Sequence, residues 1–148
     1  MGKRQPQKIK GVNPKPSRTP KKLHDPITYE DANFVWRVHD NYIDYDHPKF
    51  GWQGVKILDF LRKIIQALQS YERLKWREVR CKDHCHPWEL DELPTEFYRR
   101  LQERQILVDE LFQISLGNKP RVLGVKEGKI FYLMWYDPDH KFWPTKAK

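Results

Sequence analysis

The spacing of apolar residues predicts a strand near residue 34 and a helical block after it. Phe34-Val35-Trp36-Arg37-Val38 combines β-branched and aromatic residues, which favours a strand. Apolar residues then recur every three or four positions over about 55–72, a spacing that predicts an amphipathic helix. The apolar face of this helix consists of Ile57, Leu58, Leu61, Ile64, Ile65 and Leu68. A short helix is expected at Leu74–Val79, and Asp91-Glu92-Leu93-Pro94 opens a third one.

The last third of the chain predicts three consecutive antiparallel strands. Residues 112–116 alternate apolar and polar side chains, which predicts a half-buried strand. Residues 122–125 form the next strand, and Gly124 within it indicates a bulge or a close backbone approach. Residues 130–136 are apolar throughout, which is typical of a strand buried on both faces. We therefore expect an α+β fold: one N-terminal strand, a helical block of two to three helices, and a three-stranded antiparallel meander.

Charge divides the chain into two parts. The 148 residues carry a net charge of +8, and residues 1–22 hold eight basic residues, no acid and four prolines. The basic residues are Lys3, Arg4, Lys8, Lys10, Lys15, Arg18, Lys21 and Lys22. Such a segment buries too little apolar surface to fold alone, so residues 1–25 are expected to be a disordered basic arm, followed by a single α+β domain at 26–148. The arm is suited to neutralising nucleic-acid phosphates, and a solvated tail is the alternative.

The chain shows neither a membrane span nor a secretory signal, and it has two cysteines, so a cytoplasmic protein is expected. Both cysteines lie in Cys81-Lys82-Asp83-His84-Cys85-His86, which offers four potential zinc ligands. Structural zinc sites draw on two separated segments, and no second pair of ligands follows. We therefore expect a polar turn with a partly buried cysteine, and we predict no metal and no cofactor.

Two further groups of charged residues have structural alternatives. Asp44, Asp46 and His47 form an acidic loop that would hold a divalent ion only if other carboxylates converged on it, and the sequence shows none. Arg99, Arg100 and Arg104 would extend a phosphate-binding surface, but a solvated helix face paired with Glu96 and Glu103 is the favoured interpretation.

The meander offers the main candidate site. If its strands pair through the Glu127-Gly128 turn, Arg121 lies opposite Trp135–Asp137, which brings the candidate catalytic residues Arg121, Tyr136 and His140 to one end of the sheet. Arginine binds phosphate and histidine transfers protons near neutral pH. Together these groups would suffice to cleave RNA through its own 2′-hydroxyl. Trp135 would stack on a base and Lys141 would bind a phosphate. The alternative is an edge-strand arginine beside an ordinary Asp137-Pro138-Asp139-His140 turn.

The order of elements resembles the RelE/ParE-like superfamily of bacterial toxins. The resemblance rests on residues 111–122, where a strand leads to an arginine opening the next strand, and on 131–141, where the last core strand leads to a histidine-bearing end. Residues 90–144 also resemble uncharacterised bacterial proteins with Arg-x-x-Gly and Trp-Tyr-Asp-x-x-His patterns. The resemblance implies a metal-independent endoribonuclease, with Arg121 binding phosphate and His140 in the catalytic position. It further implies RNA, including ribosome-bound mRNA, as substrate and a cognate antitoxin as partner. The alternative is a non-enzymatic nucleic-acid-binding or protein-interaction module that uses the basic arm and aromatic surface.

Overall fold

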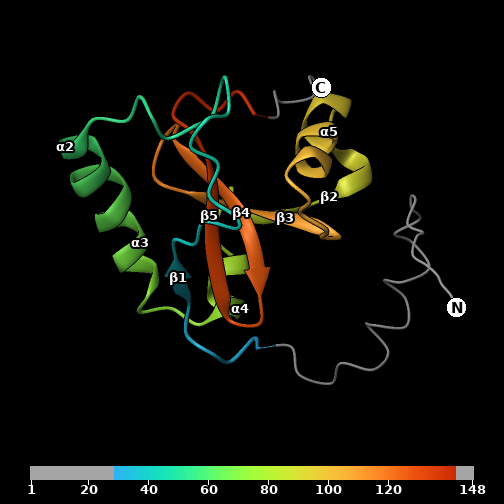
Figure 1. Ribbon diagram of the computed structural model, residues 1–148. Coiled ribbons are helices and arrows are strands. Elements are labelled where there is room, and N and C mark those ends of the chain that lie inside the picture. Colours follow the sequence, from blue (N-terminus) through green and yellow to red (C-terminus); the bar gives the residue numbers. More distant parts are fainter. Residues whose placement is uncertain (1–28, 143–148) are drawn as a thin grey trace, which may run out of the picture.

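A computed structural model describes residues 29–142 and shows a five-stranded mixed sheet (Figure 1). The strands are β1 (Val35–Arg37), β2 (His86–Glu89), β3 (Glu110–Ser115), β4 (Arg121–Glu127) and β5 (Ile130–Asp137). They lie in the order β1-β5-β4-β3-β2, in which β1 runs parallel to β5 and all other neighbours are antiparallel. The predicted α+β class, the N-terminal strand and the C-terminal antiparallel meander are confirmed.

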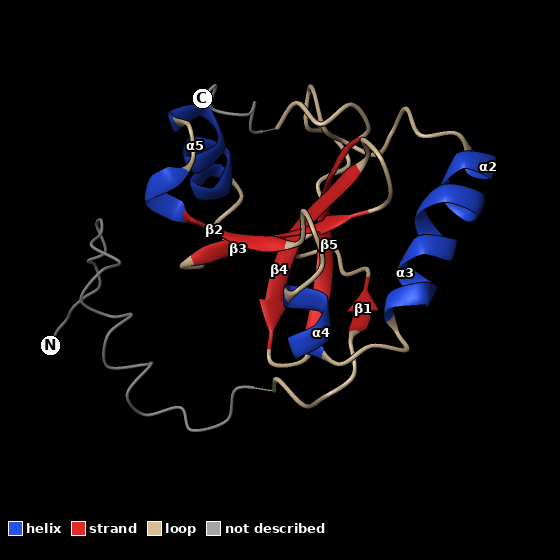
Figure 2. Cartoon of the chain, turned by 180° about the vertical axis from the view of Figure 1, so that it is seen from behind, coloured by secondary structure: helices blue, strands red, loops and turns tan. Residues whose placement is uncertain are grey.

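Helical segments separate β1 from the meander. They are α2 (Ile57–Asp59), the π-helical η2 (Phe60–Ile65), α3 (Gln66–Tyr71), α4 (Trp76–Arg80), the 3₁₀ turn η3 (Leu90–Glu92) and α5 (Thr95–Glu103). The first three are continuous and form one long helix. Figures 1 and 2 show this helix on one side of the sheet and α5 on the other.

Two hydrophobic clusters therefore cover the two faces of the sheet. On one face, Ile64 and Leu68 of the long helix and Trp76 of α4 pack against the sheet residues Phe112 and Phe131. On the opposite face, the helix α5 contributes its own buried residues, chiefly Phe97 and Leu101, which pack with Trp135 and Phe142. The strand β5 lies between β1 and β4 and is covered on both faces. This confirms the prediction, made from its continuous apolar sequence, of a strand buried on both faces.

The irregularity expected at Gly124 is present. Leu123 is opposite Trp135 and Gly124 is opposite Leu133, so Met134 is an extra residue on β5. The freed carbonyl oxygen of Met134 accepts hydrogen bonds from the Asp44 N–H (3.1 Å) and the Trp52 indole N–H (2.8 Å). The bulge thus attaches the 39–53 segment to the centre of the sheet.

Three details of the sequence prediction are wrong. The region around residue 86 is not only a turn, because His86–Glu89 forms the edge strand β2 between α4 and α5. The strand β3 is not half-buried: Gln113 and Ser115 are buried as well, since β3 is covered on both faces. The 57–71 helix does not bury its whole apolar stripe, because its first turn is exposed.

Among residues 29–142, no helix is long and apolar enough to cross a membrane.

Candidate functional site

Three histidines gather at the end of the sheet where β5 stops and β2 starts. We call His84, His86 and His140 the histidine cluster. Its framework is a row of residues across the sheet, because Asp137 pairs with Arg121 and Arg121 pairs with Ser115. His84 precedes β2 beside this row, and the ring centroids of His84 and His140 are 6.4 Å apart. At this separation the two imidazoles do not hydrogen-bond to each other, and with an interplanar angle of 65° they lie edge to face.

Both facing histidines have left-handed backbone conformations, with φ of 69° at His84 and 60° at His140. Non-glycine residues adopt this conformation rarely, and surrounding contacts must hold it. The Gln113 side-chain N–H donates to the His84 carbonyl oxygen at 2.9 Å. After β5, the Asp137 carboxylate accepts the N–H groups of the two residues beyond His140, at 2.8 and 2.6 Å. These bonds fix the turn that carries His140.

The surroundings of His140 disfavour its protonated form. Partial burial lowers the pKa of His140, the positive charge of Arg121 lowers it further, and the Asp137 carboxylate opposes the shift. His84 and His86 add smaller effects in the lowering direction. His140 therefore favours the neutral imidazole, the form that accepts a proton.

Arg121 lies opposite Asp137, within the predicted range Trp135–Asp137, and under the cluster, but it is only 1 % exposed. Its guanidinium donates to the carbonyl oxygens of Pro120 (2.9 Å), Gly117 (3.2 Å) and Asn118 (3.2 Å), all in the β3–β4 turn. Among the buried side-chain nitrogen and oxygen atoms of residues 29–142, only Nε of Arg121 lacks a hydrogen-bond partner. This geometry makes Arg121 the residue that shapes the turn and sets a positive potential under His140.

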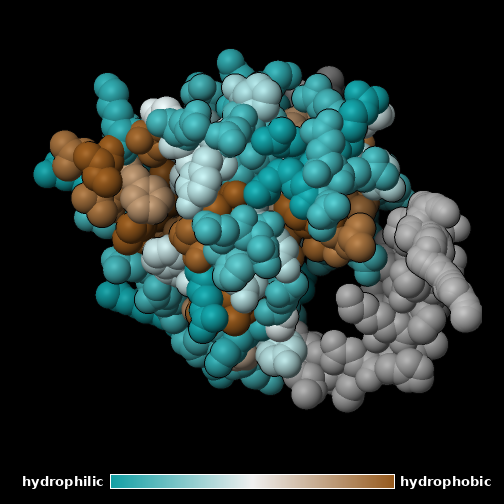
Figure 3. All heavy atoms as spheres, in the orientation of Figure 1, coloured by the Kyte–Doolittle hydropathy of each residue, from teal (hydrophilic) through white to brown (hydrophobic). Residues whose placement is uncertain are grey.

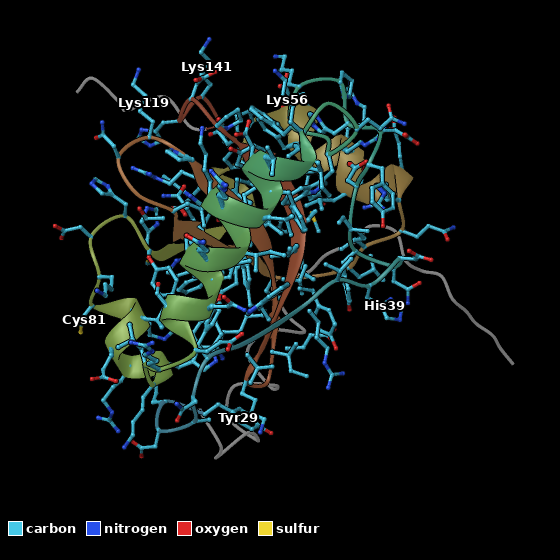
Figure 4. The ribbon with its side chains drawn as sticks, turned by 90° about the vertical axis from the view of Figure 1, so that its left-hand side faces the viewer. Tyr29, His39, Lys56, Cys81, Lys119 and Lys141 are labelled. Carbon is cyan, nitrogen blue, oxygen red and sulfur yellow. The ribbon has the colours of Figure 1, made fainter. Side chains whose placement is uncertain are left out.

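The other predicted site residues divide between the surface and the core. Lys141 is exposed and extends from the same end of the molecule as Lys119 (Figure 4). The Tyr136 ring stacks on Trp52 at 5.5 Å, and burial raises the pKa of Tyr136. Trp135 is fully buried and donates its indole N–H to Asp44 at 2.8 Å, so it has no free face for a base. The eight predicted arm residues, from Lys3 to Lys22, lie outside the described residues.

Sequence reasoning missed the contribution of His84 to this site. The dense Cys81–His86 motif drew attention to a metal, whereas its pairing with β3 places His84 beside His140. Cys81 is exposed and Cys85 is buried, with its sulfur accepting the Ser115 N–H at 3.3 Å. In residues 29–142, no three His, Cys, Asp or Glu side chains are placed to share a metal ion.

The predicted acidic loop and basic helix face in fact bind each other. Arg100 donates two hydrogen bonds to the Asp44 carboxylate, at 2.7 and 2.8 Å, and Arg104 donates to the carbonyl oxygens of Tyr42 and Ile43 at 2.8 Å each. The predicted pairing with Glu103 is present for Arg100 at 3.8 Å, but the helix face is not fully solvated at Arg100 and Arg104, because the 39–53 segment folds over α5.

The histidine cluster is thus the place where proton-transferring groups face solvent over a buried cation. Two imidazoles lie side by side, and the exposed Lys119 and Lys141 extend from one end of the molecule (Figure 4). Such an arrangement suits acid–base chemistry on an anionic substrate. Comparisons of the chain with protein-family models, with curated proteins and with solved structures found no match.

Proposed function

We propose that this protein is a metal-independent endoribonuclease that cleaves RNA at the histidine cluster, as a small RelE-like toxin. The observation that supports this most is the 6.4 Å spacing of the His84 and His140 rings, both in left-handed backbone conformations. The two rings lie edge to face beside each other, so a phosphodiester approaching from solvent would meet both imidazoles at once.

In the proposed reaction His140 is the general base. Its lowered pKa keeps it neutral near pH 7, so it takes the proton of the ribose 2′-hydroxyl. The 2′-oxygen then attacks the adjacent phosphorus and the bond to the 5′-oxygen breaks, which leaves a 2′,3′-cyclic phosphate. His84 donates the proton that the departing 5′-oxygen requires.

The positive charges have different roles from those expected. Arg121 holds the 116–120 turn and acts on His140 through its charge, because both of its terminal nitrogens donate to the turn and its Nε is buried. The exposed Lys119 and Lys141 are better placed to contact phosphates of the RNA. Tyr136 is stacked on Trp52, and we assign it no part in proton transfer.

The test is cleavage of an RNA oligonucleotide in EDTA, with and without ribosomes. Wild-type protein is expected to release a 2′,3′-cyclic phosphate, and a substrate with a 2′-deoxyribose at the cleaved position should remain intact. His140→Ala and His84→Ala are each expected to lower the rate by about 100-fold or more. His39→Ala changes an exposed histidine elsewhere on the surface and should leave the rate within twofold.

Cleavage of the deoxy substrate, or full activity in His140→Ala, would contradict the proposal. Absence of cleavage by the wild type under all these conditions would favour the second candidate, a non-enzymatic nucleic-acid-binding module.

The second candidate rests on the eight basic residues and no acid in residues 1–22. Binding carried by these charges is expected to weaken steeply with salt and to be lost when residues 1–22 are deleted. Affinity that is indifferent to salt would exclude it. A cognate antitoxin covering the histidine cluster remains a prediction under the first candidate.

A further inference from the structure

The first turns of the long helix expose three large aliphatic side chains. Ile57 is 68 % exposed, Leu58 58 % and Leu61 46 %. Leu61 follows the other two by four and three residues, so the three side chains are neighbours on one helical surface. We call Ile57, Leu58 and Leu61 the α2 patch. Figure 3 shows a hydrophobic area over α2 at the edge of the molecule.

The π-helical segment explains why these residues do not join the core. In a regular α-helix, positions 57, 61, 64 and 68 share one stripe, which is what the sequence pattern predicts. The η2 segment, Phe60–Ile65, has wider turns than an α-helix and therefore changes the direction of the residues that precede it. Ile64 and Leu68 remain buried, whereas Ile57 and Leu61 are left at the surface. The exposure of the α2 patch therefore follows from the π-helical segment η2.

Basic side chains border the α2 patch. Lys56 and Arg62 are exposed, and within residues 29–142 neither forms an ion pair. The acidic residue of this surface, Asp59, is already paired with Lys63 at 3.6 Å. The patch is therefore apolar at its centre and carries unbalanced positive charge at its rim.

The positive charge around the α2 patch indicates which kind of segment can bind there. The chain's own N-terminal residues 1–22 contain eight basic residues and no acid, so they would be repelled. A second copy joined through the same helix would bring Lys56 and Arg62 near their own equivalents, which costs free energy. A segment with apolar residues at helical spacing and acidic flanks satisfies both the centre and the rim.

We infer that the α2 patch is a docking site for an acidic amphipathic helix of another protein. Leu58 and Leu61 form the apolar anchor, and Lys56 and Arg62 attract the carboxylates that flank the partner's apolar stripe. An apolar surface rimmed by charge is the usual form of such sites. This inference does not depend on RNA cleavage.

Fluorescence anisotropy with three labelled synthetic peptides and the full chain tests the inference. The first is an amphipathic helix with Leu at i, i+3, i+4 and i+7 and Glu on its flanks. The second replaces Glu by Lys, and the third has the composition of the first in an order without an apolar stripe. Wild-type protein is expected to bind the first at least tenfold more tightly than the other two.

Variants locate the binding site. Leu58→Ser and Leu61→Ser are expected to weaken binding of the first peptide by tenfold or more, and Arg62→Glu to weaken it by a similar factor. Leu107→Ser is the matched control, because Leu107 is 92 % exposed and lies outside the patch. Circular dichroism should be unchanged in all of them, since each altered side chain is exposed.

Three outcomes would overturn the inference. One is equal binding of the ordered and scrambled acidic peptides, which would indicate attraction to the basic arm alone. Another is a loss of binding in Leu107→Ser equal to that in Leu58→Ser. The third is a wild-type dimer in sedimentation analysis that Leu58→Ser converts to monomer, because the patch would then join two copies of this chain.

Discussion

The Asp44 carboxylate and the Arg100 guanidinium form a bidentate ion pair across two segments of the fold. Nε of Arg100 donates to Oδ2 of Asp44 at 2.8 Å and Nη2 donates to Oδ1 at 2.7 Å. Asp44 is only 2 % exposed and also accepts the Trp135 indole N–H. Burial by itself raises the pKa of Asp44, but the bonds from Arg100 and Trp135 and the charge of Arg104 outweigh it, so that the pKa is lowered. The pair joins the 39–53 segment to α5.

Asp44→Asn is expected to lower the free energy of unfolding by about 2–3 kcal/mol, because it leaves Arg100 with only the longer, exposed pair to Glu103. Arg100 keeps partial access to water, which places the loss at the lower end of the range for a broken buried pair. Urea denaturation at pH 7 measures it. Asp46→Asn is the control: Asp46 is exposed, accepts a hydrogen bond from the Gln53 side chain and acts on Arg100 only through its charge, so a change within about 0.5 kcal/mol is expected.

The same pair predicts an acid-sensitive contribution to stability. The pKa of Asp44 is lower in the folded protein than in the unfolded chain, so its contribution is complete above the unfolded pKa of about 3.9 and is lost as the pH falls through the folded pKa. Asp44 also raises the pKa of His47, so the effect of Asp44→Asn is measured in a His47→Asn background. There the loss of unfolding free energy should be constant from pH 7 to 5 and decrease below about pH 4. A difference that grows in acid would contradict this assignment.

His47 is expected to destabilise the fold when it is protonated. Its Nδ1 accepts the backbone N–H groups of Lys49 (3.0 Å) and Phe50 (3.1 Å), so a proton on Nδ1 removes both bonds. Burial lowers the pKa of His47, and Asp44 only partly opposes this. The unfolded chain therefore binds protons more readily, and stability should fall as the pH drops from about 6.5 towards the folded pKa.

His47→Asn tests this contribution, because an asparagine oxygen can accept the same N–H groups without titrating. Urea denaturation between pH 8 and 5 should show a smaller loss of stability in His47→Asn than in the wild type. His39→Asn is the matched control, since His39 also accepts a backbone N–H through Nδ1 but is exposed. Equal pH dependence in His47→Asn and wild type would refute the argument.

Gly124 is expected to be intolerant of any side chain. A Cβ there would lie 2.0 Å from the Tyr132 carbonyl oxygen, which is backbone in the middle of the sheet and cannot move aside cheaply. Gly124→Ala should therefore destabilise the protein by about 3 kcal/mol or more, as overpacking does. Gly54→Ala is the control, because no atom lies within 4 Å of its added Cβ. Equal melting temperatures for the two variants would disprove the close approach.

The sequence was most informative where one physical effect decides the structure. The uniformly apolar 130–136 run could only be a central strand, and Gly124 correctly indicated an irregular, crowded position. The spacing of apolar residues over 57–71 predicted one continuous buried stripe. That prediction is wrong because the π-helical segment η2 rotates the preceding residues away from the core. Residue spacing alone does not reveal such a segment. The strand β2 was not predicted, because it depends on pairing with β3, which lies about 25 residues further along the chain.

The candidate site shows the same division. The register of the meander placed Arg121 opposite Asp137, as the turn position predicted. Sequence patterns do not measure burial. Arg121 and Trp135 were therefore predicted to contact RNA, but both side chains are buried in the fold. The facing of His84 and His140 depends on contacts between segments more than 50 residues apart, which no local motif encodes.

Arg121 provides a test of the electrostatics of the histidine cluster. Arg121→Met keeps most of the side-chain volume but removes the charge and the donors to Gly117, Asn118 and Pro120. Unfolding free energy should fall by about 2 kcal/mol, because the partly buried carbonyl oxygens lose a charged donor, and the amides of the 116–120 turn should exchange faster. Since the positive charge of Arg121 lowers the pKa of His140, its removal should raise that pKa in an NMR titration. Lys119→Met, which removes an exposed charge from the same turn, should shift it less. A His140 pKa that is unchanged in Arg121→Met would mean that the charge of Arg121 does not reach His140, and the role of Arg121 would then be limited to holding the 116–120 turn.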